Sequence, residues 1–164
     1  MVPDAWDTSV LSRTHENGRH ASLLATHRRD AIVVPLPAPA VQELVRGLSA
    51  PHLPREPALS RLRWFGDLIE DPLAHVIAFG SAAAQLAGWL LAQIPHPPTR
   101  NHRRAGTRAQ QRAAWALDVQ IAACAFAGGY GVLTENVDDF AALRDAIAQV
   151  LPDVRPLSVR NARI

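Results

Sequence analysis

Residues 113–140 read AAWALDVQIAACAFAGGYGVLTENVDDF, and this stretch decides the fold class. Small and apolar residues dominate positions 113–126, which predicts a buried helix that ends at the following Gly-Gly pair. Positions 130–133 predict a short strand, and apolar residues at helical spacing predict a second helix over 136–150. A strand between two helices is the repeating unit of a parallel sheet that is covered by helices.

The rest of the chain continues this alternation of strands and helices. Its 164 residues suit one domain, spanning 1–164, with a core of its own. We therefore predict an α/β fold in three layers, with helices on both faces of a mainly parallel sheet. Pro35 and Pro37 are expected to end a strand, and Pro39 to begin a helix. The further predicted strands cover 4–11, 31–34, 75–79 and 154–159, and the further predicted helices cover 19–29, 39–48, 58–69 and 82–93.

Residue usage excludes several classes of protein. The one cysteine, Cys124, excludes a disulfide framework and cysteine-rich zinc sites, and we expect it to be a small buried residue. All 17 basic residues are arginines, so no lysine is present for a Schiff base or a phosphate-binding loop. The sequence holds no apolar run long enough to span a membrane, and its first residues do not resemble a signal peptide. We therefore expect a cytoplasmic protein without a membrane partner.

The positive charge of the chain is unevenly distributed. The formal net charge is only +2, yet residues 100–112, RNHRRAGTRAQQR, contain five arginines and no acid. Such a cluster can contact phosphates. The alternative is a solvent-exposed loop and helix start, because runs of like charge are often simply exposed. The candidate phosphate-binding residues are Arg100, Arg103, Arg104, Arg108 and Arg112.

Three acids lie in places where acids are unusual. Asp7 opens the Asp-Thr-Ser stretch with which the first predicted strand ends, at the sheet edge where α/β folds place their sites, although a turn or helix-cap aspartate is the alternative. Glu43 has small and apolar neighbours on its helix, although it could face water and pair with Arg46. Asp118 shares its helical face with alanine, leucine and isoleucine, where an ionised carboxylate needs an ion, an arginine or a backbone donor as its partner.

Further oxygen ligands follow the strand at 130–133. In LTENVDDF, residues 133–140, Asn136 can cap the next helix while Asp139 completes a capping box, and both aspartates favour the positive helix end. Asp138 is expected to face solvent in that role, and Glu135 to be a surface residue at the strand end. Carboxylates gathered from strand ends and inward helix faces can also hold magnesium or manganese, which prefer oxygen ligands.

Three segments in this order resemble a known family. DTSVLS (7–12), ELVRG (43–47) and LDVQIAACAFAGGYGVLTENVDDF (117–140) are similar to the PIN-domain family, in particular its VapC-type toxin ribonucleases. The resemblance spans nearly the whole chain, and its last segment is the most specific. It implies a PIN-like domain of three α/β/α layers and an endoribonuclease that hydrolyses RNA phosphodiesters with metal-activated water.

The resemblance also implies roles for single residues. The acidic quartet that binds Mg²⁺ or Mn²⁺ would be Asp7, Glu43, Asp118 and Asp139, and the T-x-N-x-x-D spacing selects Asp139 rather than its neighbour. Supporting contacts to this quartet would come from Ser9, Thr134 and Asn136. The implied partners are the RNA substrate, a cognate antitoxin protein and a second copy of the chain in a homodimer.

The sequence departs from the family pattern at the N-terminus and in the basic segment. The first strand of the family is longer and more apolar than VPDAW, residues 2–6, and segment 95–112 is longer and more basic than the family's. We expect that segment near the site, where it would contact RNA phosphates. Two other functions stay open: a non-catalytic PIN scaffold that binds RNA or protein, and a metal-dependent α/β phosphohydrolase of another class.

Overall fold

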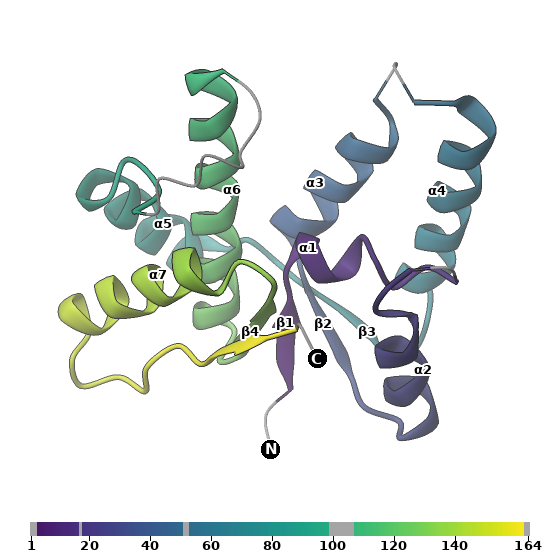
Figure 1. The fold of residues 1–164 in the computed structure, drawn as a ribbon. Helices are drawn as coiled ribbons and strands as arrows, with labels where there is room; N and C mark the ends of the chain where they lie inside the picture. Colours follow the sequence, from purple (N-terminus) through teal and green to yellow (C-terminus); the bar gives the residue numbers. More distant parts are fainter. Residues whose placement is uncertain (1–2, 17, 51–52, 99–106, 163–164) are drawn as a thin grey trace.

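The computed structural model describes residues 3–16, 18–50, 53–98 and 107–162, which form seven helices and five strands (Figure 1). β1 (Asp4–Trp6) pairs with β4 (Gly131–Thr134), and β4 pairs with β5 (Val159–Asn161). β2 (Val34–Pro37) pairs with β3 (Ala74–Ile77). These pairings are all parallel, and β1 lies beside β2, so the strands follow the order β3-β2-β1-β4-β5 across the molecule.

Two prolines lie inside β2, which the sequence analysis expected to end before them. The Val34 N–H donates to Leu73 O, so Val34 and Leu36 direct their backbone groups towards β3. By alternation, Pro35 and Pro37, which lack an N–H, face β1 and remove no bond to β3. They explain why β1 and β2 lie side by side without a hydrogen-bonded ladder among the described strands. The strand predicted at 31–34 was therefore displaced towards the C-terminus.

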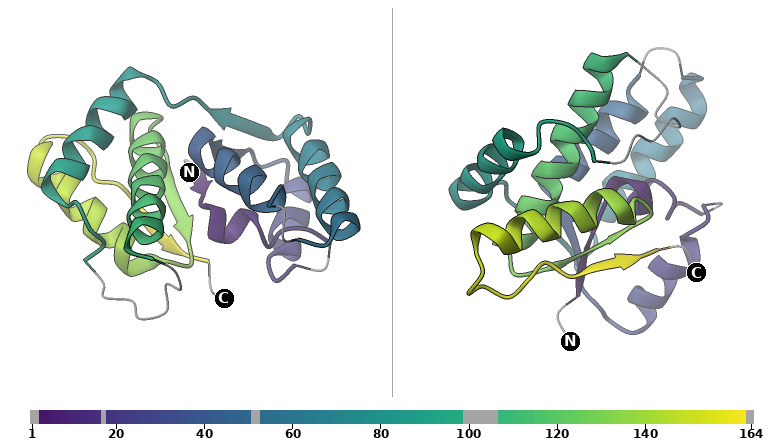
Figure 2. Two further views of the ribbon diagram at one scale, coloured as in Figure 1. Left: turned by 90° about the horizontal axis from the view of Figure 1, so that it is seen from above. Right: turned by 60° about the vertical axis from the view of Figure 1, so that its left-hand side comes forward.

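Helices cover both sides of the strands, as the three-layer prediction required (Figures 1 and 2). α5 (Ser81–Gln93), α6 (Arg108–Ala127) and α7 (Val137–Val150) lie on one side. The other side carries α1 (Thr8–Leu11), α2 (Ala21–Arg29), α3 (Ala38–Leu48) and α4 (Arg55–Ile69). Alternation along β1 connects the two sides, because Ala5 belongs to the core under α6 and Trp6 to the core under α2 and α4.

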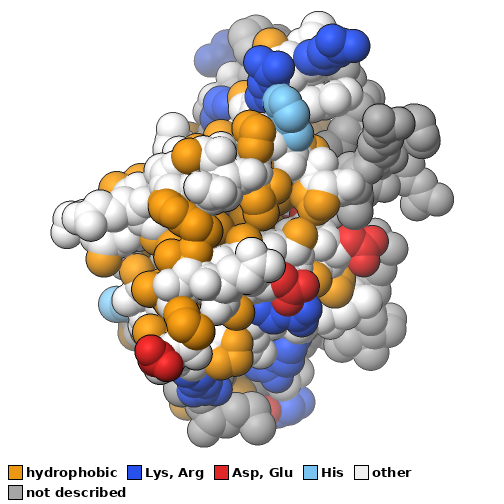
Figure 3. Space-filling model, turned by 90° about the vertical axis from the view of Figure 1, so that its left-hand side faces the viewer, with side chains coloured by type: hydrophobic (Ala, Val, Ile, Leu, Met, Phe, Trp, Pro, Cys, Tyr) orange, Lys and Arg blue, Asp and Glu red, His pale blue; other side chains and the backbone are white. Residues whose placement is uncertain are grey.

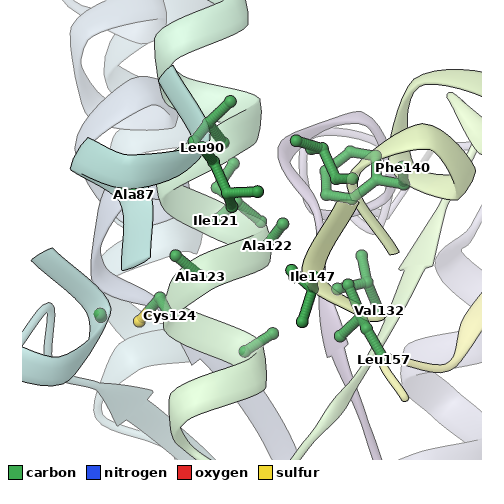
Figure 4. Packing of buried hydrophobic residues seen from close by; sticks show 14 of the residues in the cluster. Ala87, Leu90, Ile121, Ala122, Ala123, Cys124, Val132, Phe140, Ile147 and Leu157 are labelled. Atoms are coloured by element: carbon green, nitrogen blue, oxygen red, sulfur yellow. The ribbon is translucent and has the colours of Figure 1, made fainter. Parts of the chain in front are cut away.

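The larger core is built around α6. Trp115, Ile121 and Cys124 are buried there, and they pack with Phe140 and Ile147 of α7 (Figure 4). The buried Trp115 donates its indole N–H to Ile94 O at 2.7 Å, and Cys124 Sγ lies 3.3 Å from Ile77 O. The predicted buried helix and the predicted burial of Cys124 are confirmed.

Several predicted boundaries differ from the structure. The strand expected over 4–11 ends at Trp6, because Asp7 caps a helix that begins at Thr8. α6 begins at Arg108 rather than at 113, because Thr107 and Gln110 form a capping box that extends the helix into the basic segment. The last strand is Val159–Asn161 rather than 154–159.

One helix gives an apolar character to the surface. α5 contains no charged residue, and its partly buried Leu86, Trp89 and Leu91 pack against the core. Figure 3 shows apolar side chains spread over this side of the molecule. Within the described part of the chain, no helix combines the length and the apolar character that crossing a membrane would require.

Candidate functional site

The candidate site lies where β1 and β4 end. The two strands are parallel and neighbouring, and Trp6 pairs with Leu133, so the residues that follow them meet at one edge of the sheet. The Asp7 N–H donates to Leu133 O at 3.0 Å, which fixes Asp7 beside Thr134. Residues that are 127 positions apart in the sequence thus become neighbours.

Asp7 is held in the site by three hydrogen bonds to its carboxylate. Its Oδ1 accepts the Thr8 N–H at 2.7 Å, which makes Asp7 the N-cap of α1. Its Oδ2 accepts the hydroxyls of Ser9 at 2.7 Å and Thr134 at 2.8 Å. The helix-cap interpretation of Asp7 is therefore correct, and the same carboxylate also joins two strand ends.

Asp7 is nearly inaccessible to solvent, with 3% exposure. Burial raises the pKa of its carboxyl group, and the hydrogen bonds from Ser9, Thr134 and Thr8 oppose that rise without cancelling it. Desolvation therefore disfavours the ionised form of Asp7 in the folded protein. A cation beside Asp7 would offset this cost of desolvation, because an opposite charge favours the ionised form.

Asn136 connects the two other aspartates of the predicted quartet. Its Nδ2 donates to Asp139 Oδ2 at 2.8 Å and lies 3.4 Å from Asp118 Oδ2. Asp118 comes from the middle of α6, and Asp139 from the first turn of α7, where it is fully buried. Asn136 occupies the N-cap position of α7, but its side chain makes no cap hydrogen bond, so the predicted capping box was wrong. Its side-chain amide contacts the carboxylates of Asp118 and Asp139 instead.

Thr134 joins the two halves of the site. Its hydroxyl donates to Asp7 Oδ2 at 2.8 Å and accepts the Asn136 N–H at 2.9 Å. Asp7, Asp118 and Asp139 are therefore members of one hydrogen-bonded network, with Thr134 and Asn136 as its links. The structure brings together these residues and Ser9, which the sequence analysis had named from two of the three segments, 7–12 and 117–140.

Glu43 lies on a neighbouring helix but outside this network. It is half-buried on α3, which packs against α1 and α6. Within the described part of the chain, no hydrogen bond or ion pair connects Glu43 to Asp7, Asp118 or Asp139. Its role in the quartet stays a prediction.

The donor chemistry of the site fits a hard divalent ion, because its acids offer only oxygen ligands. The arrangement is not a preassembled metal centre, however. No group of three or more histidine, cysteine or acidic side chains among the described residues is close enough together to hold a metal ion. Asn136 and Thr134 stand between the three aspartates, and the carboxylates would have to draw closer to bind one ion.

Glu135 was expected to be a surface residue, and this prediction was wrong. Its side chain is only 7% exposed, and its Oε2 accepts Arg13 Nη1 at 2.6 Å and Arg19 Nη2 at 2.8 Å. His20 Nε2 hydrogen bonds to Oε1 at 2.7 Å. Burial acts to raise the pKa of Glu135, but the hydrogen bonds and charges of His20 and Arg13 outweigh it and lower the pKa overall. Asp138, by contrast, is exposed as predicted.

The sequence analysis did not single out the three basic partners of Glu135. Arg13, Arg19 and His20 stand within eight positions of one another, around Gly18, and that density of cations in a turn was the available signal. Their common target lies more than a hundred positions away. The contact could therefore be found only in the folded chain.

The arginines of the basic segment are only partly described. Arg100, Arg103 and Arg104 lie outside the described residues. Arg108 and Arg112 are exposed in the first turns of α6. At a rise of about 1.5 Å per residue, they lie roughly 15 and 9 Å along the helix from Asp118.

The sequence matches no protein-family model, and no curated protein sequence is similar enough to count as a relative. Solved structures with a similar fold exist. A chain of VapBC2 from Rickettsia felis, bound to a DNA fragment from its promoter, is 16% identical, with 96% of both chains covered and a TM-score of 0.60. A chain of DNA-bound VapBC from Salmonella typhimurium is 17% identical, with 98% of both chains covered and a TM-score of 0.61. A chain of FitAcB from Neisseria gonorrhoeae is 21% identical, with 96% of both chains covered and a TM-score of 0.57. At these identities the likeness shows a shared fold over nearly the full length.

Proposed function

We propose that this protein is the toxin of a toxin–antitoxin pair and acts as an endoribonuclease that depends on Mg²⁺ or Mn²⁺. The observation that carries the proposal is the network that joins Asp7, Asp118 and Asp139 at the ends of β1 and β4. The resemblance of the sequence to PIN-domain toxins names these same three residues. The fold shared with VapBC and FitAcB chains supports the toxin–antitoxin context.

Each residue of the network has a task in this proposal. Mg²⁺ or Mn²⁺, when bound, activates water and neutralises phosphoryl charge. Asp7, Asp118 and Asp139 are the proposed ligands, and Glu43 completes the quartet. Ser9 and Thr134 fix the Asp7 carboxylate through their hydroxyls, while Asn136 holds Asp118 and Asp139 at a common point. Arg108, Arg112 and the arginines at 100, 103 and 104 are proposed to contact RNA phosphates.

The proposed partners are an antitoxin protein and a second copy of the chain. VapBC and FitAcB are complexes, which supports a partner protein for this chain. The apolar side chains over α5 offer the kind of surface that two copies of a chain bury. Sedimentation equilibrium of the purified chain measures whether it forms a dimer. If a small reading frame adjoins the gene, co-expression of its product with this chain tests whether that product is the antitoxin.

Asp118→Asn is the variant that tests the proposed activity, and Asp138→Asn is its matched control. Each variant removes one carboxylate: Asp138 lies in the first turn of α7, and Asp118 lies on α6, opposite that turn. Asp138 is exposed and takes part in none of the hydrogen bonds of the network described above. We expect Asp118→Asn to lower cleavage of single-stranded RNA by about a hundredfold or more, because loss of even an outer partner of a metal ligand typically costs about 10- to 100-fold in activity. Asp138→Asn should cleave like the wild type.

The assay follows RNA cleavage with Mn²⁺ and again with EDTA. Circular dichroism and thermal unfolding establish that the variants are folded. Wild-type activity in EDTA, or unchanged cleavage by folded Asp118→Asn, would contradict the proposal. RNA binding without any cleavage would favour the non-catalytic scaffold, and faster turnover of a small phosphate ester than of RNA would favour another phosphohydrolase.

A further inference from the structure

We propose that Arg13 and Arg19, held by Glu135 and accompanied by His20, form a phosphate-binding subsite that positions the RNA backbone beside the acidic network. The inference rests on the proposed ribonuclease function and names a further binding element for it. It concerns residues that are distinct from the basic segment 100–112 and from the acidic quartet.

The first argument is that the cluster combines a nearly buried carboxylate and imidazole with two exposed guanidinium groups. Glu135 and His20 are nearly buried, with side-chain exposures of 7% and 6%, whereas Arg13 and Arg19 are 42% and 54% exposed. Each arginine uses one guanidinium nitrogen on Glu135, at 2.6 and 2.8 Å. A guanidinium carries five N–H donors, so each arginine keeps donors beyond the nitrogen it uses on Glu135 that are available to a phosphate.

The second argument is charge. Two guanidinium groups share one carboxylate, so these three contacting side chains together carry one positive charge in excess. A phosphodiester that approaches Asp7, Asp118 and Asp139 meets like charge, which disfavours its binding. Cations placed beside the acids offset that repulsion and favour the approach of RNA.

The third argument is direct attachment to the site. Glu135 stands between Thr134, which donates to Asp7, and Asn136, which donates to Asp139. The Glu135 N–H donates to Ser9 Oγ at 3.0 Å, and Ser9 in turn donates to Asp7. The backbone that positions the arginines is therefore the same backbone that positions the acids.

The fourth argument is the constrained turn that carries the cations. The His20 N–H donates to Arg13 O at 2.8 Å, and the Gly18 N–H donates to His15 O at 2.6 Å. A Cβ at Gly18 would lie 2.0 Å from Arg13 O, so only glycine fits there. The turn thus brings Arg13, Arg19 and His20 to one carboxylate in a defined arrangement, which is costly to hold on a freely moving loop.

The test measures RNA binding without catalysis, so that it does not depend on the proposed activity. A short fluorescently labelled single-stranded RNA is titrated with protein in EDTA, at several salt concentrations, and fluorescence anisotropy is recorded. The variants are Arg13→Gln, Arg19→Gln and the control Arg29→Gln. Arg29 is an exposed arginine at the end of α2 and pairs with Asp30. The chain continues from there to the start of β2, so Arg29 lies at the edge of the sheet opposite the candidate site.

We expect each subsite variant to weaken RNA binding by about three- to tenfold and to lower the slope of log K against log salt by about one. The control should bind like the wild type. In Mn²⁺, Arg19→Gln should raise KM for RNA cleavage while kcat stays within about twofold, because it removes binding that is equal in ground and transition states.

A second variant separates positioning from simple charge. Glu135→Gln removes a negative charge, so charge alone predicts tighter RNA binding. Loss of the carboxylate that holds both arginines predicts weaker binding instead, and this is the outcome that the proposal requires. Tighter binding by folded Glu135→Gln would overturn the positioning role.

The outcomes distinguish this inference from the proposed function. If Arg13→Gln and Arg19→Gln bind RNA as well as Arg29→Gln does, the subsite is wrong, even where Asp118→Asn abolishes cleavage. If they weaken RNA binding but the wild type never cleaves RNA in Mn²⁺, the subsite stands and the ribonuclease proposal fails. A parallel titration with labelled polyglutamate tests an acidic protein as the partner. If the two variants lose polyglutamate binding while their RNA binding is unchanged, the cluster binds an acidic protein and not RNA.

Discussion

Replacing Asp7 with asparagine should stabilise the protein in the absence of divalent ions while it removes activity. Asp7 is 3% exposed, and burial raises the pKa of its carboxyl group above the value of 3.8 for an ordinary aspartate. The charge therefore opposes folding at neutral pH. Asparagine has nearly the same shape and carries no charge, so it removes that cost.

The magnitude follows from two opposing effects. The Asp7 Oδ1 accepts the Thr8 N–H, and its Oδ2 accepts the hydroxyls of Ser9 and Thr134. Asparagine offers one acceptor oxygen, for the Thr8 N–H, and an NH2 group to which the two hydroxyls must turn as acceptors. We take the weakening of these three hydrogen bonds to cost roughly 1 kcal/mol each. Burial of the ionised group costs several kcal/mol. The raised pKa indicates that burial dominates, so we expect a net gain on the order of 1 kcal/mol, or about 2–4 °C in Tm for a chain of this size.

The effect should depend on pH with a defined sign. Because the folded-state pKa of Asp7 is raised, the folded protein binds this proton more tightly than the unfolded chain does. The associated stability is fully present below about pH 4 and is lost as the pH rises through the folded-state pKa. The Tm advantage of Asp7→Asn should therefore be smallest near pH 4 and grow towards pH 7.

Thermal unfolding in EDTA at pH 4 and pH 7, with urea unfolding as a second measure, tests this reasoning. Mn²⁺ should then raise the free energy of unfolding of the wild type by about 2.7 kcal/mol at a hundredfold excess over Kd, and so raise its Tm. It should raise the Tm of Asp7→Asn much less. Equal or lower stability of the variant at both pH values would refute the argument, because the hydrogen bonds would then outweigh the cost of burying the charge.

Two further predictions concern the backbone and the link between the strands. Ala31 has a φ of 51° just after α2, whereas Gly129 has a φ of 77° in open space, so Ala31→Gly should stabilise and Gly129→Ala should destabilise the protein by about 1 kcal/mol each in urea unfolding. Equal signs for the two changes would show that φ is not the cause. Thr134→Val keeps the shape but removes one of the three hydrogen bonds that Asp7 accepts and the hydroxyl that accepts the Asn136 N–H, so it should cost about 1–3 kcal/mol and weaken RNA cleavage. A neutral effect on both would argue against Thr134 as the link.

Much of the fold was predictable because it depends on local patterns. The apolar segment around Trp115 and Ile121 is long enough to require a buried helix, and the structure has one at α6. The expected failures occur where tertiary context overrides a local rule. Pro35 and Pro37 would break a strand that forms hydrogen bonds to a strand on each side. Among the described strands, β2 forms such a ladder with β3 alone, and it therefore accepts both prolines.

The candidate site was predictable in its members and not in its geometry. Asp7, Asp118 and Asp139 could be named from their unusual surroundings and from the resemblance to PIN domains, and the structure joins them through hydrogen bonds. Glu135 looked like a surface residue because nothing near it in the sequence is basic. Its partners Arg13 and Arg19 lie more than a hundred positions away.

The sequence alone determined the alternation of helices and strands and the identity of the acids, because periodicity and residue chemistry act over a few neighbouring positions. Tertiary structure alone decided that the ends of β1 and β4 adjoin, that Asn136 holds two carboxylates instead of capping its helix, and that Glu135 gathers a cationic cluster. Apart from the Asn136–Asp139 hydrogen bond, these contacts join residues far apart in the chain, and no local pattern records which distant partner a side chain will meet. Strand pairing brings these partners together, and the cost of burying their charges then selects the contacts that form.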